Sequence, residues 1–242
     1  VKKYNDSFLI ALILLIALVL RIWDFGNMQF MYDELSALVR TQFSSISELI
    51  QQGVIPDYHP AGIQIFLFYW VQLVGTTEWL IRLPFILSGL LSIYIFYLIG
   101  KQWFNPTTAL ISASFLAGLQ IFVMYGQLAR PYSSGLLFCL LTVWTWSNFI
   151  FNKEQPSYKW LIGFIISASL CTYNHHISML FAGIVGLTGF FFLSLKQWIP
   201  YLISGIVIVL LYLPHINILM EQLARGGVGG ADGWLAKPES NW

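Results

Sequence analysis

Unbroken apolar blocks are the feature that most limits what this 242-residue chain can fold into. The first block, FLIALILLIALVLRIW, occupies residues 8–23. Hydrophobic residues make up 57% of the chain and charged residues 10%, whereas soluble domains carry about 25% charged residues. One aqueous core cannot bury so much apolar surface. Because the blocks are continuous and do not alternate, we predict an all-α, multispanning bundle of transmembrane helices and no β-barrel.

The blocks predict several membrane spans, most of which reach the roughly 17–25 residues needed to cross a bilayer. Tyrosine and tryptophan recur at their ends, as expected at a membrane–water interface. No small-residue cleavage site follows the first block, so we interpret it as a retained span and not as a signal peptide. Cys139 and Cys171 lie in or at the end of apolar blocks and predict no disulfide, metal or redox role. The predicted spans are 8–23, 81–100, 107–125, 131–151, 159–173, 178–195 and 198–213.

Two segments between the first and second spans have the patterns of helices that do not cross. Residues 33–52 place apolar side chains on one helical stripe and polar ones on the other, which predicts an amphipathic helix in the membrane surface, ended by Gly53. The apolar part of 59–75 is short for a span, which favours an interfacial or re-entrant helix. If it does not cross, the acids of the first loop and Arg130 share one side of the membrane. If it crosses, they lie on opposite sides.

The charged residues distinguish the two sides of the preferred topology. The 12 lysines and arginines divide equally, so the positive-inside rule gives no orientation. Apart from Lys237, however, one side holds only lysines and the other only arginines, and all acids except Asp6 and Glu154 lie with the arginines. Arginine is the better bidentate ligand for phosphate, so we predict that its side is the functional one. No basic run is present, which argues against a nucleic-acid partner.

The stretch FMYDELSALV places two acids, Asp33 and Glu34, at the start of the predicted surface helix. They are candidates for a catalytic general base or for metal ligands, because partial burial at a membrane surface can tune the pKa of a carboxyl group. Their ordinary alternative is a helix cap, since acids in a first turn meet the helix dipole favourably. The sequence leaves the need for a divalent metal open and predicts no other cofactor.

Further residues on the arginine side are candidates for binding a phosphate group. Each has an ordinary alternative: an arginine can extend to the interface, a tyrosine can belong to the aromatic belt, and a histidine can occupy a turn. Adjacent histidines on a helix do not face the same way, so they predict a metal site only weakly. Together the candidates suit a phosphate-bearing lipid substrate. They are His59, Arg82, Arg130, Tyr132, His175 and His176.

Four stretches resemble membrane glycosyltransferases of the GT-C class: MYDELSALV, HPAGIQIFLFYW with the following GTTEWLIRLPF, GQLARPYSSGLLF and, more loosely, YNHHISML. The resemblance covers about residues 8–215. It is greatest to the family 39-like group that includes protein O-mannosyltransferases and lipid A aminoarabinose transferases. It implies a GT-C-like fold with juxtamembrane helices in the first outer loop, residues 24–80. It also implies a polyprenyl-phosphate-linked sugar as donor and Asp33 as the catalytic residue, with Glu34 as its neighbour.

The resemblance further implies transfer to a lipid, glycan or protein acceptor, with inversion at the anomeric carbon. Phosphate is a stable leaving anion, so one base is enough, and Arg130, Arg82 or a histidine would stabilise the departing charge. The implied location is a bacterial cytoplasmic membrane, with the active site facing outward. The chain has MYDE where the family usually has W-x-D-E, and HPA where it has HPP.

We expect residues 1–215 to form the membrane module and 216–242 to form a Gly-rich outer loop. Family members carry further spans and a C-terminal domain, so we expect the chain to stop before the rest of that fold. Two alternatives remain open: a transporter or lipid-binding membrane protein, and a non-catalytic scaffold. A transporter more often shows paired broken helices in two related halves, and no such internal symmetry is visible.

Overall fold

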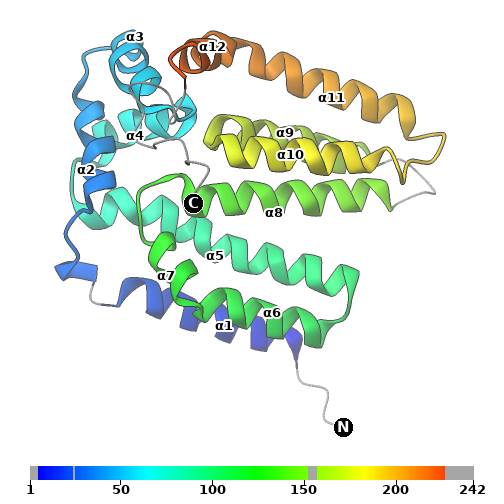
Figure 1. Ribbon diagram of the computed structural model, residues 1–242. Coiled ribbons are helices and arrows are strands. Elements are labelled where there is room, and N and C mark those ends of the chain that lie inside the picture. The colour runs from blue at the N-terminus through cyan, green and yellow to red at the C-terminus, as the bar shows by residue number, and fades with distance from the viewer. Residues whose placement is uncertain (1–4, 24, 152–156, 227–242) are drawn as a thin grey trace, which may run out of the picture.

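The computed structural model describes residues 5–23, 25–151 and 157–226 of the chain. Every regular element within these residues is a helix and none is a strand, which confirms the predicted all-α class. The helices that run along the bundle in Figure 1 are α1 (Asp6–Ile22), α5 (Glu78–Trp103), α6 (Pro106–Gly118), α8 (Pro131–Ile150), α9 (Tyr158–Asn174), α10 (His176–Gly189) and α11 (Trp198–Tyr212).

Shorter elements gather at one end of this bundle, where α5 and α8 begin and α9 and α11 finish (Figure 1). We call it the first-loop end, because most of these elements belong to the loop between α1 and α5. They are α2 (Tyr32–Val39), α3 (Ile46–Glu48), α4 (Ala61–Val74), α7 (Gln120–Gly126) and α12 (Ile216–Ala224), with the turns η1 (Phe25–Asn27), η2 (Arg40–Gln42), η3 (Leu49–Val54), η4 (Ile55–Asp57) and η5 (Leu213–His215).

Four helical segments in the described part of the chain are long and apolar enough to cross a membrane, or five if a bent pair is counted as one span. They are Asp6–Asn27, Glu78–Trp103, Pro131–Ile150 and Trp198–Ala224. The predicted continuous span 107–125 is wrong in detail, because the chain leaves the helical conformation at Leu119 and α6 and α7 meet at 61°. The predicted spans at α9 and α10 form helices of 17 and 14 residues, at or below the roughly 17-residue minimum for a membrane span.

The predicted surface helix 33–52 is not continuous, because a second helix start lies inside it. The Ser45 side chain accepts a hydrogen bond from the Glu48 backbone N–H at 3.1 Å, while the Glu48 carboxylate accepts from the Ser44 backbone N–H at 2.9 Å. This reciprocal capping pattern begins a new helix. Gly53 does not end that helix. It is buried inside η3, where an added Cβ would lie 3.0 Å from the Phe43 ring.

Helix α4 lies across the first-loop end and does not traverse the bundle. At its start, the Ala61 backbone N–H donates to His215 Nε2 at 3.0 Å, and near its finish Trp70 Nε1 donates to the Leu80 carbonyl at 2.9 Å. Both partners belong to the first-loop end, since η5 follows α11 and α5 begins there. The first-loop acids and the start of α8 can lie on the same side of the membrane only if α4 does not cross it, and this position of α4 fits that topology. The position of α4 in a membrane interface remains a prediction.

Helix α12 occupies the first nine residues of the predicted Gly-rich loop. The predicted last span stops at residue 213, whereas the chain turns through η5 and resumes a helix. Gln222 anchors that helix, because its Nε2 donates to the Val54 and His59 carbonyls at 3.1 and 2.9 Å. The rest of the predicted loop, residues 227–242, lies outside the described residues.

The described basic residues separate between the ends of the bundle. The opposite end holds the α5–α6 and α10–α11 connections, and Gln197 Nε2 before α11 donates to the Phe149 carbonyl at 2.6 Å. All described lysines lie there, near the last residue of α5, near the first residue of α9 and before α11, and all described arginines lie at or near the first-loop end. The lysines are Lys101, Lys159 and Lys196; the arginines are Arg21, Arg40, Arg82, Arg130 and Arg225.

Candidate active site

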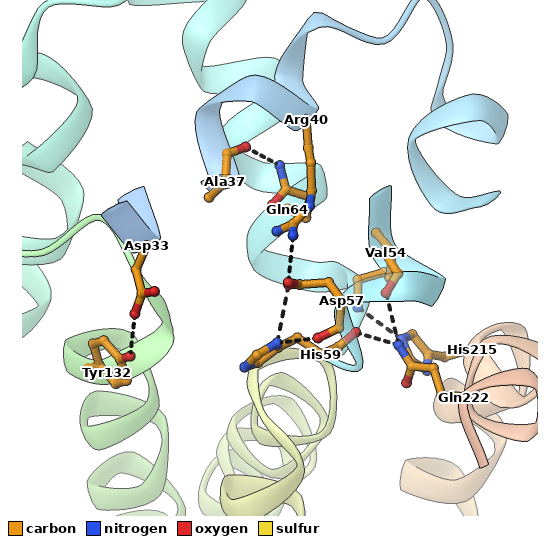
Figure 2. A network of polar contacts seen from close by, with 11 residues as sticks. Asp33, Ala37, Arg40, Val54, Asp57, His59, Gln64, Tyr132, His215 and Gln222 are labelled. Atoms are coloured by element: carbon orange, nitrogen blue, oxygen red, sulfur yellow. Dashed lines mark hydrogen bonds and ion pairs between the residues drawn. The ribbon is translucent and has the colours of Figure 1, made fainter. Parts of the chain in front are cut away.

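Asp33 is an exposed carboxylate in the first turn of α2. Its Oδ2 lies 3.5 Å from the hydroxyl of Tyr132, which stands in the first turn of α8 (Figure 2). A donor–acceptor distance of this length makes the hydrogen bond weak. Asp33 therefore has the access that a proton acceptor needs, and it is held against the start of α8 by a contact that a substrate could replace.

Glu34, its neighbour, is fully buried and faces the other way. Its two oxygens accept from Arg82 Nε at 2.8 Å and Nη2 at 2.6 Å, from the Ala129 backbone N–H at 2.9 Å and from the Met31 backbone N–H at 3.0 Å. These bonds join α2, α5 and the segment before α8. The structure therefore places Glu34 as a structural anchor, with no oxygen facing solvent.

Arg82 is fully buried as well, although the sequence made it a candidate for phosphate binding. Besides Glu34, its guanidinium donates to the Met28 and Gln29 carbonyls at 2.7 and 2.9 Å. The rings of Phe25 and Phe30 lie 5.5 and 5.1 Å from its central carbon. Its donors are thus directed at the loop that precedes α2, and burial keeps it from a substrate in this conformation.

Arg130 is the N-cap of α8 and is only 9% exposed. Its Nε is buried and has no hydrogen-bond partner. A small cavity beside it is lined by Asp57, His59 and Asn174. A buried guanidinium with an unused donor at a helix N-terminus suits an anion, because the dipole and the donor both favour negative charge.

Asn174 fixes the start of α8 against the end of α9. Its Nδ2 donates to the Pro131 carbonyl at 2.9 Å, and its Oδ1 accepts from the Ser134 hydroxyl at 2.7 Å. An added Cβ on Gly135 would lie 2.8 Å from Asn174 Nδ2, so the two helices meet closely here. Asn174 was not among the sequence candidates, yet it holds the element that presents Arg130.

Asp57 is a second residue of the cavity that sequence reasoning missed. Arg40 Nη2 lies 2.7 Å from its Oδ1, and His59 Nδ1 lies 3.1 Å from its Oδ2 and 2.8 Å from its carbonyl (Figure 2). Tyr58 between them adopts a left-handed backbone with φ of 56°, which is uncommon for a residue other than glycine. The sequence IPDYHP carried a signal, an acid and a histidine in one tight turn, but no helical pattern points to the pairing.

Opposing effects set the ionisation of Asp57. Burial alone would raise the pKa of its carboxyl group. The hydrogen bond and charge of His59, together with the charges of Arg40 and Arg130, hold that pKa below its ordinary value. Asp57 is therefore a carboxylate at neutral pH, and it balances part of the positive charge around the cavity.

His175 contacts His59, which lines this cavity, and their ring centroids are 5.3 Å apart in an edge-to-face arrangement. Burial, together with the nearby His59, His176 and Arg130, which act in the same direction, lowers the pKa of His175 to about 4. Its Nδ1 accepts from the Ile177 backbone N–H at 3.1 Å, which leaves Nε2 as the protonated nitrogen. His175 is therefore neutral at neutral pH and could donate one hydrogen bond to a phosphate, but it adds no positive charge.

The predicted metal ligands do not converge. Asp33 is exposed beside Tyr132, whereas Glu34 is enclosed by Arg82. Among the residues that the structure describes, no group of three or more histidine, cysteine, aspartate or glutamate side chains is placed to hold a metal ion.

A larger apolar cavity of about 670 Å³ lies between α9, α10 and α11. Its lining includes Phe164 and Ala182 deep in the bundle and Thr172 and Tyr212 toward the first-loop end. Thr172 stands two residues before Asn174, which lines the small cavity beside Arg130. The end of α9 therefore borders both spaces.

A family model described as dolichyl-phosphate-mannose-protein mannosyltransferase matches residues 58–218. The matched range starts just before α4 and finishes within α12, so it contains His59, Arg130 and the His175 junction and begins after Asp33. Comparison with curated proteins and with solved structures found no match.

Proposed function

The chain belongs to the dolichyl-phosphate-mannose-protein mannosyltransferase family, and we propose that it moves a sugar from a polyprenyl-phosphate donor to an acceptor at the membrane surface. Membership makes it a membrane glycosyltransferase of the GT-C, mannosyltransferase type. The proposal adds the donor, inversion at the anomeric carbon, and an active site at the first-loop end that faces outward from a bacterial cytoplasmic membrane. The acceptor would be a lipid, a glycan or a protein.

One observation carries the proposal: an exposed acid and a buried arginine with an unused donor flank the same tyrosine. Asp33 contacts the hydroxyl of Tyr132, and Arg130 stands two residues before Tyr132 at the start of α8. A transferase of this kind needs a base near the acceptor and a cation near the leaving phosphate. Asp33 and Arg130 supply these two groups on adjoining elements.

In the proposed reaction, Asp33 takes the proton from the acceptor hydroxyl or amine as its oxygen or nitrogen attacks the anomeric carbon. The new bond forms on the face opposite the phosphate, and the carbon–oxygen bond to the phosphate breaks with its electron pair. The phosphate leaves as an anion, so no second carboxyl group is needed to protonate it, in contrast to glycosidases. Arg130 would stabilise the charge that develops on that phosphate.

The apolar cavity between α9, α10 and α11 supports a lipid-linked donor. Its volume of about 670 Å³ lies within the range of roughly 300–1,000 Å³ usual for ligand sites, and its lining is almost entirely apolar. A polyprenyl chain could lie there while the phosphate reaches Arg130, because the end of α9 borders both spaces.

The test is Asp33→Asn, measured with a radiolabelled polyprenyl-phosphate-mannose donor in membranes that contain the chain. We expect transfer to fall by about 10²-fold or more, the usual contribution of a general base. Glu78→Gln is the matched control, because Glu78 is also an exposed acid in the first turn of a helix, α5. Both variants lose the same helix-dipole interaction, and only Asp33→Asn should lose transfer.

Equal transfer by Asp33→Asn and the unmodified chain would remove Asp33 as the base. A product that retains the donor's anomeric configuration would contradict inversion. If the unmodified chain shows no transfer to any membrane component, a lipid-binding function without catalysis becomes the better reading.

A further inference from the structure

Arg21 is a buried cation that the proposed reaction does not use. It stands in the last turn of α1 and is 1% exposed. Its Nη1 donates to the Ala17 and Ala117 carbonyls at 3.0 and 3.2 Å, and its Nη2 donates to the Phe122 carbonyl at 3.3 Å. Ala117 and Phe122 lie on either side of the α6–α7 bend, where the helical hydrogen-bond ladder is interrupted. Ala117 lies in the last turn of α6, so its carbonyl is one that the bend sets free, and Arg21 supplies it with a donor.

These bonds leave the Arg21 guanidinium incompletely satisfied. Its Nε is buried and has no hydrogen-bond partner. Two glycines face that nitrogen, since an added Cβ would lie 3.0 Å from it at Gly126 and 3.3 Å from it at Gly89. No carboxylate pairs with Arg21 among the residues that the structure describes. A buried guanidinium is costly unless its charge is compensated, so this position favours an anion as its partner.

A cavity of about 260 Å³ opens on this guanidinium. Its walls are mostly apolar, with Leu116, Phe122 and Leu136 among them. Tyr125, Tyr132 and Ser133 also line it, and the Ser133 hydroxyl is buried and without a hydrogen-bond partner. The cavity therefore joins an apolar wall to two unused polar groups, one of them cationic.

The rim of the cavity belongs to the lipid-facing side of the bend. Ile121 and Tyr125 on α7 line it and are 58% and 41% exposed. In a membrane helix bundle, such exposed apolar side chains meet lipid. A molecule could enter from the bilayer with its apolar part at Ile121 and its head at Arg21.

We propose that this cavity, between α1, α5, α6, α7 and the start of α8, binds the phosphate group of an anionic membrane lipid. Basic pockets between membrane helices bind lipid head groups in this way. The cavity shares no lining residue with the Arg130 cavity, although Tyr132, which contacts Asp33, lines it. It would hold lipid whether or not Asp33 is the base of the transfer reaction.

The experiment is native mass spectrometry of the full chain in neutral detergent, titrated with phosphatidic acid and, separately, with zwitterionic phosphatidylcholine. We expect one phosphatidic acid to bind at least about tenfold more tightly than phosphatidylcholine, the difference that one charge-assisted hydrogen bond supports. Gly126→Ala should remove that difference, because its methyl group meets Arg21 Nε. Gly118→Ala is the matched control, since nothing lies within 4 Å of a Cβ there.

Three further measurements could refute the inference. Gly89→Ala should act like Gly126→Ala, and these two variants test the site even if Arg21→Gln, which should also lose the preference, fails to fold. Competition by inorganic phosphate would show that the anion alone is recognised, and its absence would show that the lipid chain contributes. Arg130→Gln should keep the preference for phosphatidic acid. Equal binding of the two lipids, or an unchanged preference in Gly126→Ala, would overturn the inference.

Discussion

Two acid–arginine pairs at the same end of the bundle differ in what surrounds them. Glu34 and Arg82 meet at 2.6 Å, and Asp57 and Arg40 meet at 2.7 Å. The first pair has no exposed side-chain surface, whereas both side chains of the second are 20% exposed. The remaining donors and acceptors of the first pair form hydrogen bonds with backbone groups. The second shares its carboxylate with His59 and lies beside a second arginine.

This difference distinguishes a structural ion pair, Glu34–Arg82, from an ion pair at the candidate site, Asp57–Arg40. Glu34 pairs with one guanidinium, that of Arg82, and each nitrogen of that guanidinium donates a hydrogen bond. Around Asp57, one carboxylate meets Arg40 and Arg130, and both Arg40 Nη1 and Arg130 Nε are buried without partners. A half-buried cationic group with an unused hydrogen-bond donor favours the binding of an anion. The two ion-pair distances are nearly the same and therefore say little about the role of each pair. The balance of charge and the unused donors distinguish the two roles.

The largest effect should come from breaking the buried pair. Glu34→Gln leaves the Arg82 charge buried without its partner, and breaking a buried pair in this way costs about 3–5 kcal/mol of unfolding free energy. Thermal unfolding of the purified protein in detergent measures the loss. The double variant Glu34→Ala with Arg82→Ala should not recover it, because the Ala129 and Met31 backbone N–H groups also lose their acceptor. A loss below about 1 kcal/mol would contradict the anchor role.

The matching change in the second pair should cost less. Asp57→Asn removes the partner of Arg40 and His59, but water reaches this pair, so we expect a loss of about 1 kcal/mol, the upper range for exposed pairs. The same unfolding measurement checks it, with the exposed Glu78→Gln as the baseline for removing an acid. If Asp57→Asn cost as much as Glu34→Gln, Asp57 would be a second anchor and the contrast between the pairs would fail.

Much of this architecture could be predicted from local patterns. The apolar blocks predict the helices of the bundle, and the short apolar part of 59–75 predicts a helix that stays at one end. The sequence locates the two adjacent acids but does not show which one is buried and which one is exposed. Asp33 and Glu34 are neighbours in sequence, and only the packing of α5, with Arg82 forty-eight residues away, buries one and leaves the other exposed. A single sequence does not carry that pairing.

Other features escaped prediction because competing local signals prevailed. The capping pattern of Ser45 and Glu48 restarts the helix that periodicity alone would continue. Asp57 stands in a turn, where no periodicity marks which side chains converge. The cavity beside Arg21 depends on two glycines from separate helices, Gly89 and Gly126, which meet only in the folded bundle.

Acid should produce the smallest effect and should act on the second region only. The pKa of His175 lies at about 4, below the ordinary value of 6.5, so the unfolded chain takes up this proton first as pH falls. Its contribution to stability is therefore complete above pH 6.5 and is lost as pH falls toward 4. Protonated His175 would place another positive charge beside His59, His176 and Arg130, the groups that face it.

Hydrogen exchange at pH 7 and pH 5, corrected for the intrinsic rate at each pH, can locate this effect. We expect amides of 55–60 and 175–178 to exchange faster at pH 5, while those around Glu34 keep their protection, because no histidine among the described residues lies beside the buried pair. In His175→Gln the difference at 55–60 should shrink, since the titrating group is gone. Uniform loosening of both regions would mean that acid weakens the whole bundle, and His175 would then have no special part in it.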